Sequence, residues 1–365
     1  MKVVIAGGGT AGHVFPAIAL AQELAAHGHD VRFLGTTAGL EARLVPEAGF
    51  GFTPIRAAPL TRRPSAATLR APVVALRSVR ECQPHVAAAD VVVGMGGYVS
   101  APPVLAARRA GRPVIMHEQN AVPGLATRML SRRARAIAVS FRDAAAHLPR
   151  GVPTVFTGNP VRGRILQVPA HRDRLRNEAA GELGLDEDRF TVLVFGGSLG
   201  ALHVNRTIAG SIGHLRDRED LQLLILTGPA HLEVVSAAAQ EPMALRVRAL
   251  PFLDRMELAY AAADAVVARA GATTIAELAV CGLASLLIPY PHATADHQEA
   301  NARELERAGA AEVLVDVALH PDDLAARIVR FADDPARRND MAARASAWAT
   351  PDAAARLAAV VTDAA

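Results

Sequence analysis

At 365 residues the chain is too long for one ordinary hydrophobic core, so two domains are the expected organisation. Hydrophobic residues make up 51% of it, charged residues 21% and aromatic residues 4%, which excludes wholesale disorder and favours α/β layers over a β-sandwich. The net charge of +3 suits a local anionic partner and is too small to indicate nucleic-acid binding.

Nothing in the sequence indicates export, a membrane span or a disulfide. Cys82 and Cys281 lie far apart without metal-like spacing, so we expect two reduced thiols in a cytosolic protein. The first residues run directly into an apolar segment at 3–6, without a basic region or a cleavage site. No run of about 18 apolar residues occurs, so any membrane contact should be peripheral.

Short apolar segments alternate with longer helical patterns along the whole chain. This alternation predicts βαβ units and parallel sheets, and therefore an α/β fold. The turn-rich stretch 158–163 interrupts the pattern, and we place a domain boundary there. A last helix should begin at Thr350, a good cap, and Pro351, which suits the first helical position. The predicted strands lie at 2–6, 31–34, 90–94, 113–117, 136–139 and 154–157, and then at 191–195, 222–227, 246–249, 264–268, 284–288 and 312–315.

A glycine turn at 7–13 follows the first predicted strand and opens a helix that should run to about His27. Such a turn brings backbone N–H groups close to an anion, and the helix N-terminus adds partial positive charge. The spacing also satisfies the G-x-G-x-x-G dinucleotide pattern, which requires an acidic residue at the end of the second strand. The second strand here ends in 33–37, FLGTT, so a nicotinamide or flavin site is disfavoured.

Three further turns follow predicted strands and precede helices. The turn at 196–201 carries Ser198, and the loop at 94–100 is again rich in glycine. Any one of the three glycine turns, at 7–13, 94–100 and 196–201, can be a tight βα connection, but three in one chain favour a phosphate-bearing ligand. In the fourth turn, 269–277, the carboxylate of Glu277 can support the helix dipole or accept two ribose hydroxyls.

With these residues in view, the chain resembles the MurG family of bacterial cell-wall enzymes, which transfer N-acetylglucosamine from UDP-N-acetylglucosamine to a lipid-linked N-acetylmuramyl-pentapeptide. The matching stretches keep their order and spacing over the full length, so the match is specific. The resemblance implies an α/β GT-B fold, two Rossmann-like domains with parallel sheets separated by a cleft. The matching stretches are 8–16, 94–98, 117–120, 158–162, 196–198, 269–272 and 296–298.

The resemblance also implies what each part of the chain does. We expect an acceptor- and membrane-facing domain at 1–160 and a UDP-sugar-binding domain at 161–345. A C-terminal helix within 346–365 is expected to pack back on the first domain. The enzyme would act in peptidoglycan synthesis, and so in cell shape and division, at the cytoplasmic face of the membrane. Other cell-wall or division proteins are its expected protein partners.

For the donor, the resemblance implies roles residue by residue. Ser198 would contact a phosphate, while Arg162 and Asn120 would hold the donor from the hinge side. Glu277 would bind the ribose, and Gln298 would hydrogen-bond the sugar hydroxyls. The remaining donor positions are Leu253, whose backbone would meet the uracil, Ala272, and Thr10, Ala11 and Gly12, which would line the cleft from the other domain.

The glycine turns of the first domain would face the pyrophosphate of the acceptor. The chain departs from the family pattern at Ala11, which replaces a glycine, and at Leu199, which replaces a glutamine. Alanine costs little where φ is negative, and we assign no side-chain role to Leu199. The expected acceptor contacts are Gly9, His13, Gly96, Gly97 and Tyr98.

The transfer requires a base for the attacking hydroxyl and stabilisation of the leaving UDP. His13 is the candidate base, since the pKa of a histidine lies near neutrality; as a lone histidine after a glycine turn it can also be structural. Glu118 is a rival base, or else an anchor that accepts hydrogen bonds. Arg162 and helix N-termini can stabilise UDP without a metal, so we expect no metal and no cofactor.

Other chemistries find little support. The pair His117-Glu118 does not begin a zinc motif, because Ala121 occupies the position of the second histidine in H-E-x-x-H. The polar loop with His292, Asp296 and His297 has no clear ligand pattern. No G-x-S-x-G sequence is present to support a hydrolase.

Two stretches mix arginines with apolar residues, at 59–80 and 128–135. Each can be a solvated helix with one buried face, or an interfacial face that meets anionic lipid. A lipid-linked acceptor favours the second interpretation. Two alternatives remain: a UDP-sugar epimerase or a transferase for a soluble acceptor, and a nucleotide-binding scaffold without chemistry of its own.

Overall fold

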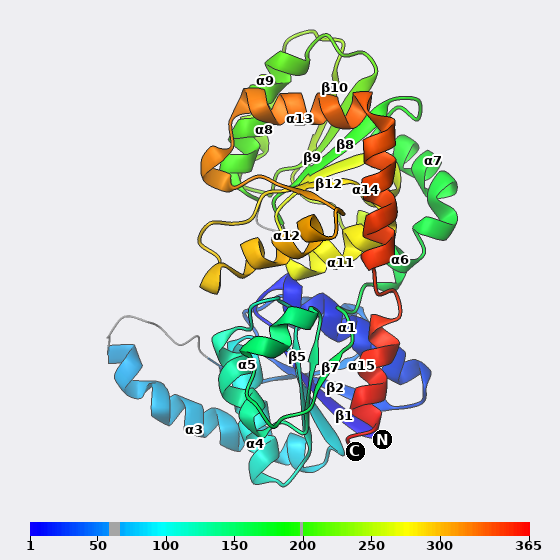
Figure 1. Cartoon of the computed structure of the whole chain (residues 1–365). Helices are drawn as coiled ribbons and strands as arrows, with labels where there is room; N and C mark the ends of the chain where they lie inside the picture. Colours follow the sequence, from blue (N-terminus) through cyan, green and yellow to red (C-terminus); the bar gives the residue numbers. More distant parts are fainter. Residues whose placement is uncertain (58–65, 198–199) are drawn as a thin grey trace. The chain divides into compact units, whose positions relative to one another are not determined.

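The protein is described from a computed structural model over residues 1–57, 66–197 and 200–365, without the side chains of 66–75 and 294 (Figure 1). It divides into two compact units. The first comprises Met1–Arg162 with Thr350–Ala365, and the second Gly163–Ala349. Within the described ranges, no helix is both long enough and apolar enough to cross a membrane.

The first unit is built on a parallel sheet with the strand order β3-β2-β1-β4-β5-β6-β7. The predicted strands of this half are confirmed with boundaries shifted by one residue or less, but β3 was missed. It is a short edge strand with glycine at its start and proline at its end, residues that rarely occur inside strands. The strands are β1 (Lys2–Ala6), β2 (Asp30–Gly35), β3 (Gly51–Pro54), β4 (Val91–Gly94), β5 (Val114–Glu118), β6 (Ala136–Val139) and β7 (Thr154–Phe156).

The second unit has a parallel sheet of its own, in the order β10-β9-β8-β11-β12-β13. Every predicted strand of this half is confirmed, with boundaries shifted by at most two residues. The predicted α/β class with parallel sheets is therefore correct for both units. The strands are β8 (Phe190–Phe195), β9 (Leu221–Leu226), β10 (Arg246–Leu250), β11 (Ala265–Ala268), β12 (Ser285–Leu287) and β13 (Glu312–Val313).

Helices pack around both sheets (Figure 1). Those of the first unit are α1 (Ala11–Ala26), α2 (Glu41–Glu47), α3 (Ala66–Ala87), α4 (Ala101–Arg109), α5 (Leu125–Leu130) and α15 (Ala353–Thr362). Those of the second are α6 (Gly163–Leu166), α7 (Arg172–Leu183), α8 (Leu202–Leu215), α9 (Leu232–Ala238), α10 (Met256–Ala262), α11 (Ala272–Cys281), α12 (His297–Arg307), α13 (Pro321–Asp333) and α14 (Pro335–Trp348).

The chain returns to the first unit through its last helix. Leu357 and Val361 of α15 share a buried cluster with Leu20 and Leu24 of α1. The helix begins slightly later than predicted, after Asp352. Thr350 packs beside Gly158, where an added Cβ would lie 2.6 Å from the Cβ of Thr350. Both termini lie at the same end of this unit (Figure 1).

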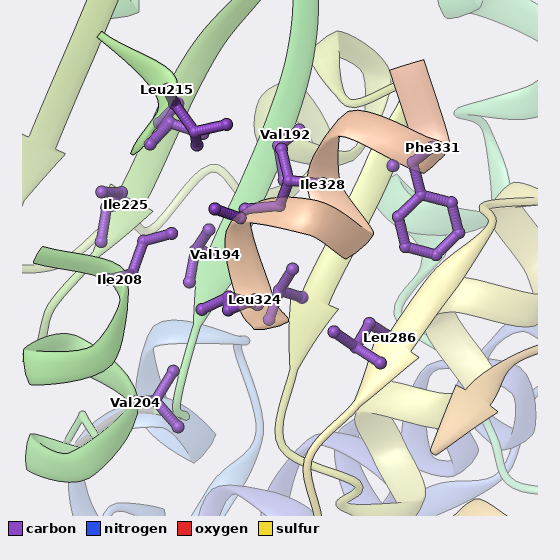
Figure 2. Close-up of a cluster of buried hydrophobic side chains, with 14 of the residues drawn as sticks. Val192, Val194, Val204, Ile208, Leu215, Ile225, Leu286, Leu324, Ile328 and Phe331 are labelled. Carbon is purple, nitrogen blue, oxygen red and sulfur yellow. The ribbon is translucent and has the colours of Figure 1, made fainter. Parts of the chain in front are cut away.

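The core of the second unit is mostly aliphatic and lies between its sheet and the helices that cover it, α8 and α13 among them. Figure 2 shows side chains of α8 and α13 packed against the strands. Each large aliphatic side chain buried in this way contributes about 1.5–3 kcal/mol. The labelled members are Val192, Val194, Val204, Ile208, Leu215, Ile225, Leu286, Leu324, Ile328 and Phe331.

The strand order decides which loops lie together. In a doubly wound sheet, ligands bind beyond the carboxyl ends of the strands at the point where the chain reverses its direction of winding. In the first unit this point lies between β1 and β4, where Ala6 pairs with Gly94. In the second it lies between β8 and β11, where Phe195 pairs with Ala268. The glycine turns therefore leave the sheets in pairs, side by side within each unit.

The glycine turn after β8 offers a stability test with a matched control. Gly200 has φ +77°, and an added Cβ would lie 2.0 Å from the carbonyl oxygen of Thr227. Gly200→Ala should therefore lower the free energy of unfolding by about 1–3 kcal/mol. Gly213→Ala, near the end of α8 with nothing within 4 Å of the added Cβ, should raise it by up to about 1 kcal/mol. Equal stabilities in denaturant unfolding would contradict this account.

Candidate active site

The glycine turn after β1 rests on a buried carboxylate that the sequence analysis missed. The backbone N–H of Gly9 donates to Oε2 of Glu41 at 2.9 Å. Oε1 of Glu41 accepts from the backbone N–H of Thr36 at 3.0 Å and from its hydroxyl at 2.7 Å. A Cβ at Gly8 would lie 2.2 Å from Oε1, so only glycine fits there. The N–H of Gly9 is therefore already engaged and does not point at a ligand.

The charge of Glu41 is stabilised by these donors. Burial raises the pKa of its carboxyl, but the hydrogen bonds from Thr36 and Gly9 outweigh burial and bring the pKa below its usual range. Glu41 opens α2 with its side chain buried. Gly35 and Gly39 leave room for this side chain, since an added Cβ at either would lie within 2.6 Å of it.

His13 lies in the first turn of α1 and contacts the loop after β4. Its Nδ1 is 3.1 Å from Oε1 of Gln119. Gly96 and Gly97, with φ of +82° and +70°, lie against the ring, because a Cβ at either would stand 3.2 Å from an imidazole carbon. Tyr98 lies beside Gly9, whose added Cβ would be 3.3 Å from the tyrosine ring. The five expected acceptor positions are thus neighbours in the first unit.

Gln119 and His117 continue inward from His13. Nε2 of Gln119 donates to the carbonyl oxygen of Met95 at 2.8 Å and lies 3.1 Å from Nδ1 of His117. Nε2 of His117 lies 3.3 Å from both the carbonyl oxygen of Gly158 and the hydroxyl of Ser140. Burial lowers the pKa of His117 to about 4, against a smaller opposing effect of the Gly158 carbonyl.

The contacts of Glu118 are those of an anchor. Its Oε1 accepts from the backbone and side-chain amides of Asn120, at 3.0 and 3.2 Å, and its Oε2 accepts from the backbone of Gly124 at 3.1 Å. The side chain is buried. Of the two roles that the sequence left open, these contacts fit the structural one, since both oxygens hold the loop that follows β5.

The other expected donor positions of the first unit lie around the start of α1 and the end of the unit. Thr10 is the exposed N-cap of α1, and Ala11 is its first residue, with a negative φ that accommodates alanine as expected. Gly12 follows in the first turn. The guanidinium of Arg162 stacks on the ring of Phe15, 4.3 Å from its centroid. This stacking links Arg162, the last residue of the continuous segment Met1–Arg162, to α1.

In the second unit the turn after β8 is held by the neighbouring strand end. The backbone of Gly200 packs tightly against Thr227, whose carbonyl oxygen accepts from the side chain of Asn205 at 2.7 Å. Ser198 and Leu199 lie outside the described residues. The turn after β11 leaves the same edge of the sheet, and α11 begins there with Ala272.

Glu277 lies in the second turn of α11 with its side chain buried. Its Oε2 accepts from the hydroxyl of Tyr260 at 2.9 Å, and the ring of Tyr260 packs edge-on against Phe195. This tyrosine was not found from the sequence, because an isolated tyrosine in a helical pattern carries no signal of its partner. The contact fixes the direction of the carboxylate.

A buried ion pair connects the end of β11 to the loops beside it. Arg269 lies 2.6 Å from Oδ2 of Asp316 and donates to the carbonyl oxygens of Ile288 and Pro289, at 3.1 and 3.0 Å. The other oxygen of Asp316 lies 2.6 Å from Nδ1 of His203. Burial raises the pKa of Asp316, but its bonds to His203 and Arg269 bring it below the usual range.

Gln298 and Leu253 occupy loops on the same unit. The side-chain oxygen of Gln298 accepts from the backbone N–H of Tyr290 at 2.9 Å, which leaves its amide nitrogen as the donor end. Leu253 lies half-buried between β10 and α10. Across the residues described, no group of three or more histidine, cysteine, aspartate or glutamate side chains is placed to hold a metal ion.

Comparison with known proteins defines the class. The family model of the glycosyltransferase family 28 N-terminal domain matches residues 3–139, and that of the family 28 C-terminal domain matches residues 191–357. A Staphylococcus aureus MnaA structure with UDP shares the fold, with a TM-score of 0.70 at 14% identity over 98% of this chain and 95% of that one. The chain is thus a glycosyltransferase of family 28 with the GT-B fold.

Closer relatives specify the family. Two relatives carry the name UDP-N-acetylglucosamine--N-acetylmuramyl-(pentapeptide) pyrophosphoryl-undecaprenol N-acetylglucosamine transferase. The one from Bacillus licheniformis is 40% identical over 98% of this chain and 97% of its own length. The one from Bacillus subtilis is 38% identical over 100% of this chain and 99% of its own length. The crystal structure of Acinetobacter baumannii MurG matches with a TM-score of 0.77 and 30% identity over 99% of both chains. The chain belongs to the MurG family, as its motifs predicted.

The buried carboxylate under the first glycine turn predicts an acid dependence of stability. The pKa of Glu41 is below its ordinary value near 4.5 only in the folded protein. The ionised carboxylate therefore stabilises the fold above about pH 4.5, and this contribution is lost as the pH falls through the lower, folded pKa. Glu41→Gln should destabilise the protein by about 1–3 kcal/mol at pH 7, because an amide NH₂ would face backbone donors.

The same variant should flatten the pH profile, which thermal unfolding between pH 7 and 3 can measure. Glu47→Gln is the control, since Glu47 lies on the same helix with its side chain 54% exposed. The account is wrong if the two variants lose the same stability at pH 7, or if Glu41→Gln keeps the full acid dependence.

Proposed function

We propose that this chain transfers N-acetylglucosamine from UDP-N-acetylglucosamine to N-acetylmuramyl-(pentapeptide) pyrophosphoryl-undecaprenol, with inversion at the anomeric carbon. This converts lipid I to lipid II in peptidoglycan synthesis. The observation that carries the proposal is the match over nearly the whole chain to transferases named for this reaction. The family models match both halves of the chain.

The second unit is proposed to bind the donor. Its two glycine- and alanine-rich turns end at the reversal point of the sheet, where parallel α/β sheets bind nucleotides. Glu277, aimed by Tyr260, is suited to accept the ribose hydroxyls. Gln298 would bind the sugar hydroxyls through its amide nitrogen, and the backbone near Leu253 would meet the uracil. Arg162 and the helix N-termini would stabilise the charge that develops on UDP.

The first unit is proposed to bind the acceptor and to supply the base. His13 lies among the acceptor positions Gly96, Gly97 and Tyr98. A histidine side chain is suited to take a proton near neutral pH, because the ordinary pKa of this residue type lies close to neutrality. Glu118 is the weaker candidate, since its two oxygens already hold a loop.

The alternative of an epimerase draws on the fold alone: a putative UDP-N-acetylglucosamine 2-epimerase from Listeria monocytogenes has a TM-score of 0.69 at 15% identity, over 100% of this chain and 96% of that one.

A basic and apolar face on the first unit is proposed to meet the cytoplasmic face of an anionic membrane. Helix α4 packs against both α3 and α5. Leu105 of α4 and Leu125 and Met129 of α5 are exposed, the last two by 54% and 61%. Partial burial, and then the nearby charge of Arg133, lower the pKa of Arg108, so these two arginines lie near each other in this region. Apolar side chains among arginines are suited to an interface with anionic lipid.

The second predicted stretch, 59–80, is only partly described. Residues 59–65, with Arg62 and Arg63, lie outside the described residues, as do the side chains at 66–75. At the end of the stretch, Leu76 is 45% exposed, and Arg77 and Arg80 are also exposed on α3. These side chains add to the same three-helix region.

Vesicle binding tests the proposed membrane face. Replacing Leu125 and Met129 with glutamine should weaken binding to phosphatidylglycerol-containing vesicles by about tenfold or more, because two apolar side chains no longer enter the interface. Val317→Gln, on the other unit and 83% exposed, is the control and should bind as wild type does. Comparing sedimentation with anionic and with neutral vesicles separates the electrostatic from the apolar contribution to binding. Unchanged binding by the double variant would refute the assignment of this face.

The reaction itself is tested by UDP release. The purified protein, with UDP-N-acetylglucosamine and a lipid-linked muramyl-pentapeptide acceptor, should release UDP and form a disaccharide product in the presence of a chelator. UDP release no faster than without acceptor would reject the transferase assignment. Activity that appears only with an added divalent metal would instead reject the metal-free mechanism.

A further inference from the structure

The side-chain amide of Gln119 can point in only one direction. The carbonyl oxygen of Met95 accepts and cannot donate, so the group that faces it at 2.8 Å must be the NH₂ end. The oxygen end then faces Nδ1 of His13 at 3.1 Å. Because an amide oxygen only accepts, Nδ1 of His13 has to carry a hydrogen.

We propose that Gln119 is a positioning residue that fixes the tautomer of His13, so that Nδ1 holds the proton and Nε2 holds the lone pair. The inference rests on the proposed function, in which His13 is the base. In that step the O–H bond of the acceptor sugar breaks and its proton moves to Nε2. The oxygen bonds to the anomeric carbon, and the sugar–phosphate bond breaks with its electron pair leaving on UDP.

His117 stabilises this arrangement from behind. Gln119 offers its second N–H to Nδ1 of His117 at 3.1 Å, so the proton of the neutral His117 ring lies on Nε2, near the carbonyl oxygen of Gly158. The ring is buried with a pKa of about 4 and stays neutral at physiological pH. A protonated His117 would turn a donor toward the NH₂ of Gln119, so burial keeps the acceptor in place.

This chain of hydrogen-bond donors suits both the neutral and the protonated ring of His13. Each donor points inward, from His13 to Gln119, from Gln119 to His117 and from His117 to the backbone. When Nε2 accepts a proton, the Nδ1–H bond to the amide oxygen becomes charge-assisted and no group has to turn. An amide carries no net charge, so it orients the ring without the increase in pKa of about 1–3 units that a carboxylate would cause.

The neighbouring glycines fit this role. A Cβ at Gly96 would lie 3.3 Å from Oε1 of Gln119 and 3.2 Å from Cε1 of His13. A Cβ at Gly97 would lie 3.4 Å from Nε2 of His13. Both residues also have a positive φ, which side chains disfavour. The loop after β4 can therefore lie directly against the bond between His13 and Gln119.

The tautomer can be read directly from the full-length protein. Long-range proton–nitrogen spectra of the ¹⁵N-histidine-labelled chain distinguish a protonated from an unprotonated ring nitrogen, and the signals lost in His13→Ala and His117→Asn assign the two rings. We expect the Nδ1–H form for neutral His13 and the Nε2–H form for His117 across the pH range of stability. A neutral His13 in the Nε2–H form would overturn the proposal.

Two substitutions of Gln119 then separate positioning from packing. Gln119→Met keeps the length but loses the amide; kcat should fall by about tenfold or more, within the roughly 10²–10⁴-fold that base catalysis provides, with KM for UDP-N-acetylglucosamine unchanged. Gln119→Glu should keep the Nδ1–H form and move the acidic limb of the kcat/KM profile up by about 1 unit or more. Full kcat in a folded Gln119→Met, or an unmoved limb in a folded Gln119→Glu, would overturn the proposal.

The base assignment fails separately. If His13→Ala keeps near-normal turnover with both substrates saturating, His13 is not the base, whatever the spectra show. The tautomer measurement does not depend on activity, so it tests the hydrogen-bond arrangement of His13 and Gln119 in either case. Thermal unfolding of each variant shows whether it has folded.

Discussion

Each unit depends on the parallel pairing of its two central strands. Parallel strands present their carboxyl ends at one edge, and the pairs β1 with β4 and β8 with β11 end level with one another. Loops that are distant in sequence, such as 7–13 and 94–100, therefore begin side by side. The candidate site residues of each unit lie near this edge, where turns meet helix N-termini.

Buried polar groups then give the turns their shape. In the first unit the carboxylate of Glu41 holds the turn after β1, and in the second the ion pair of Arg269 with Asp316 holds the turn after β11. Each of these charges is compensated by several hydrogen bonds, which an isolated buried charge would lack. A glycine turn that is packed against such a group is a rigid part of the site, and its N–H groups are divided between internal partners and ligand.

Much of this architecture could be predicted, because strands buried on both faces read as apolar runs and glycine turns mark their ends. The strand β3 could not, since its register at the sheet edge is set by pairing with β2 and not by its own residues. The partners Glu41, Tyr260 and Gln119 escaped for a different reason. The bonds of Tyr260 with Glu277, of Gly9 with Glu41 and of His13 with Gln119 join residues 17, 32 and 106 positions apart, and only the folded chain brings them together.

The last helix has a consequence for how the protein is made. The core of the first unit includes Leu357 and Val361, whereas the second unit is one continuous segment, Gly163–Ala349. At about 5–20 residues per second, the ribosome needs on the order of 10–40 s to synthesise that segment. During that time the first unit lacks its last helix, whereas every residue of the second unit is synthesised. The contribution of α15 to the core of the first unit is therefore the last to become available, after the complete second unit.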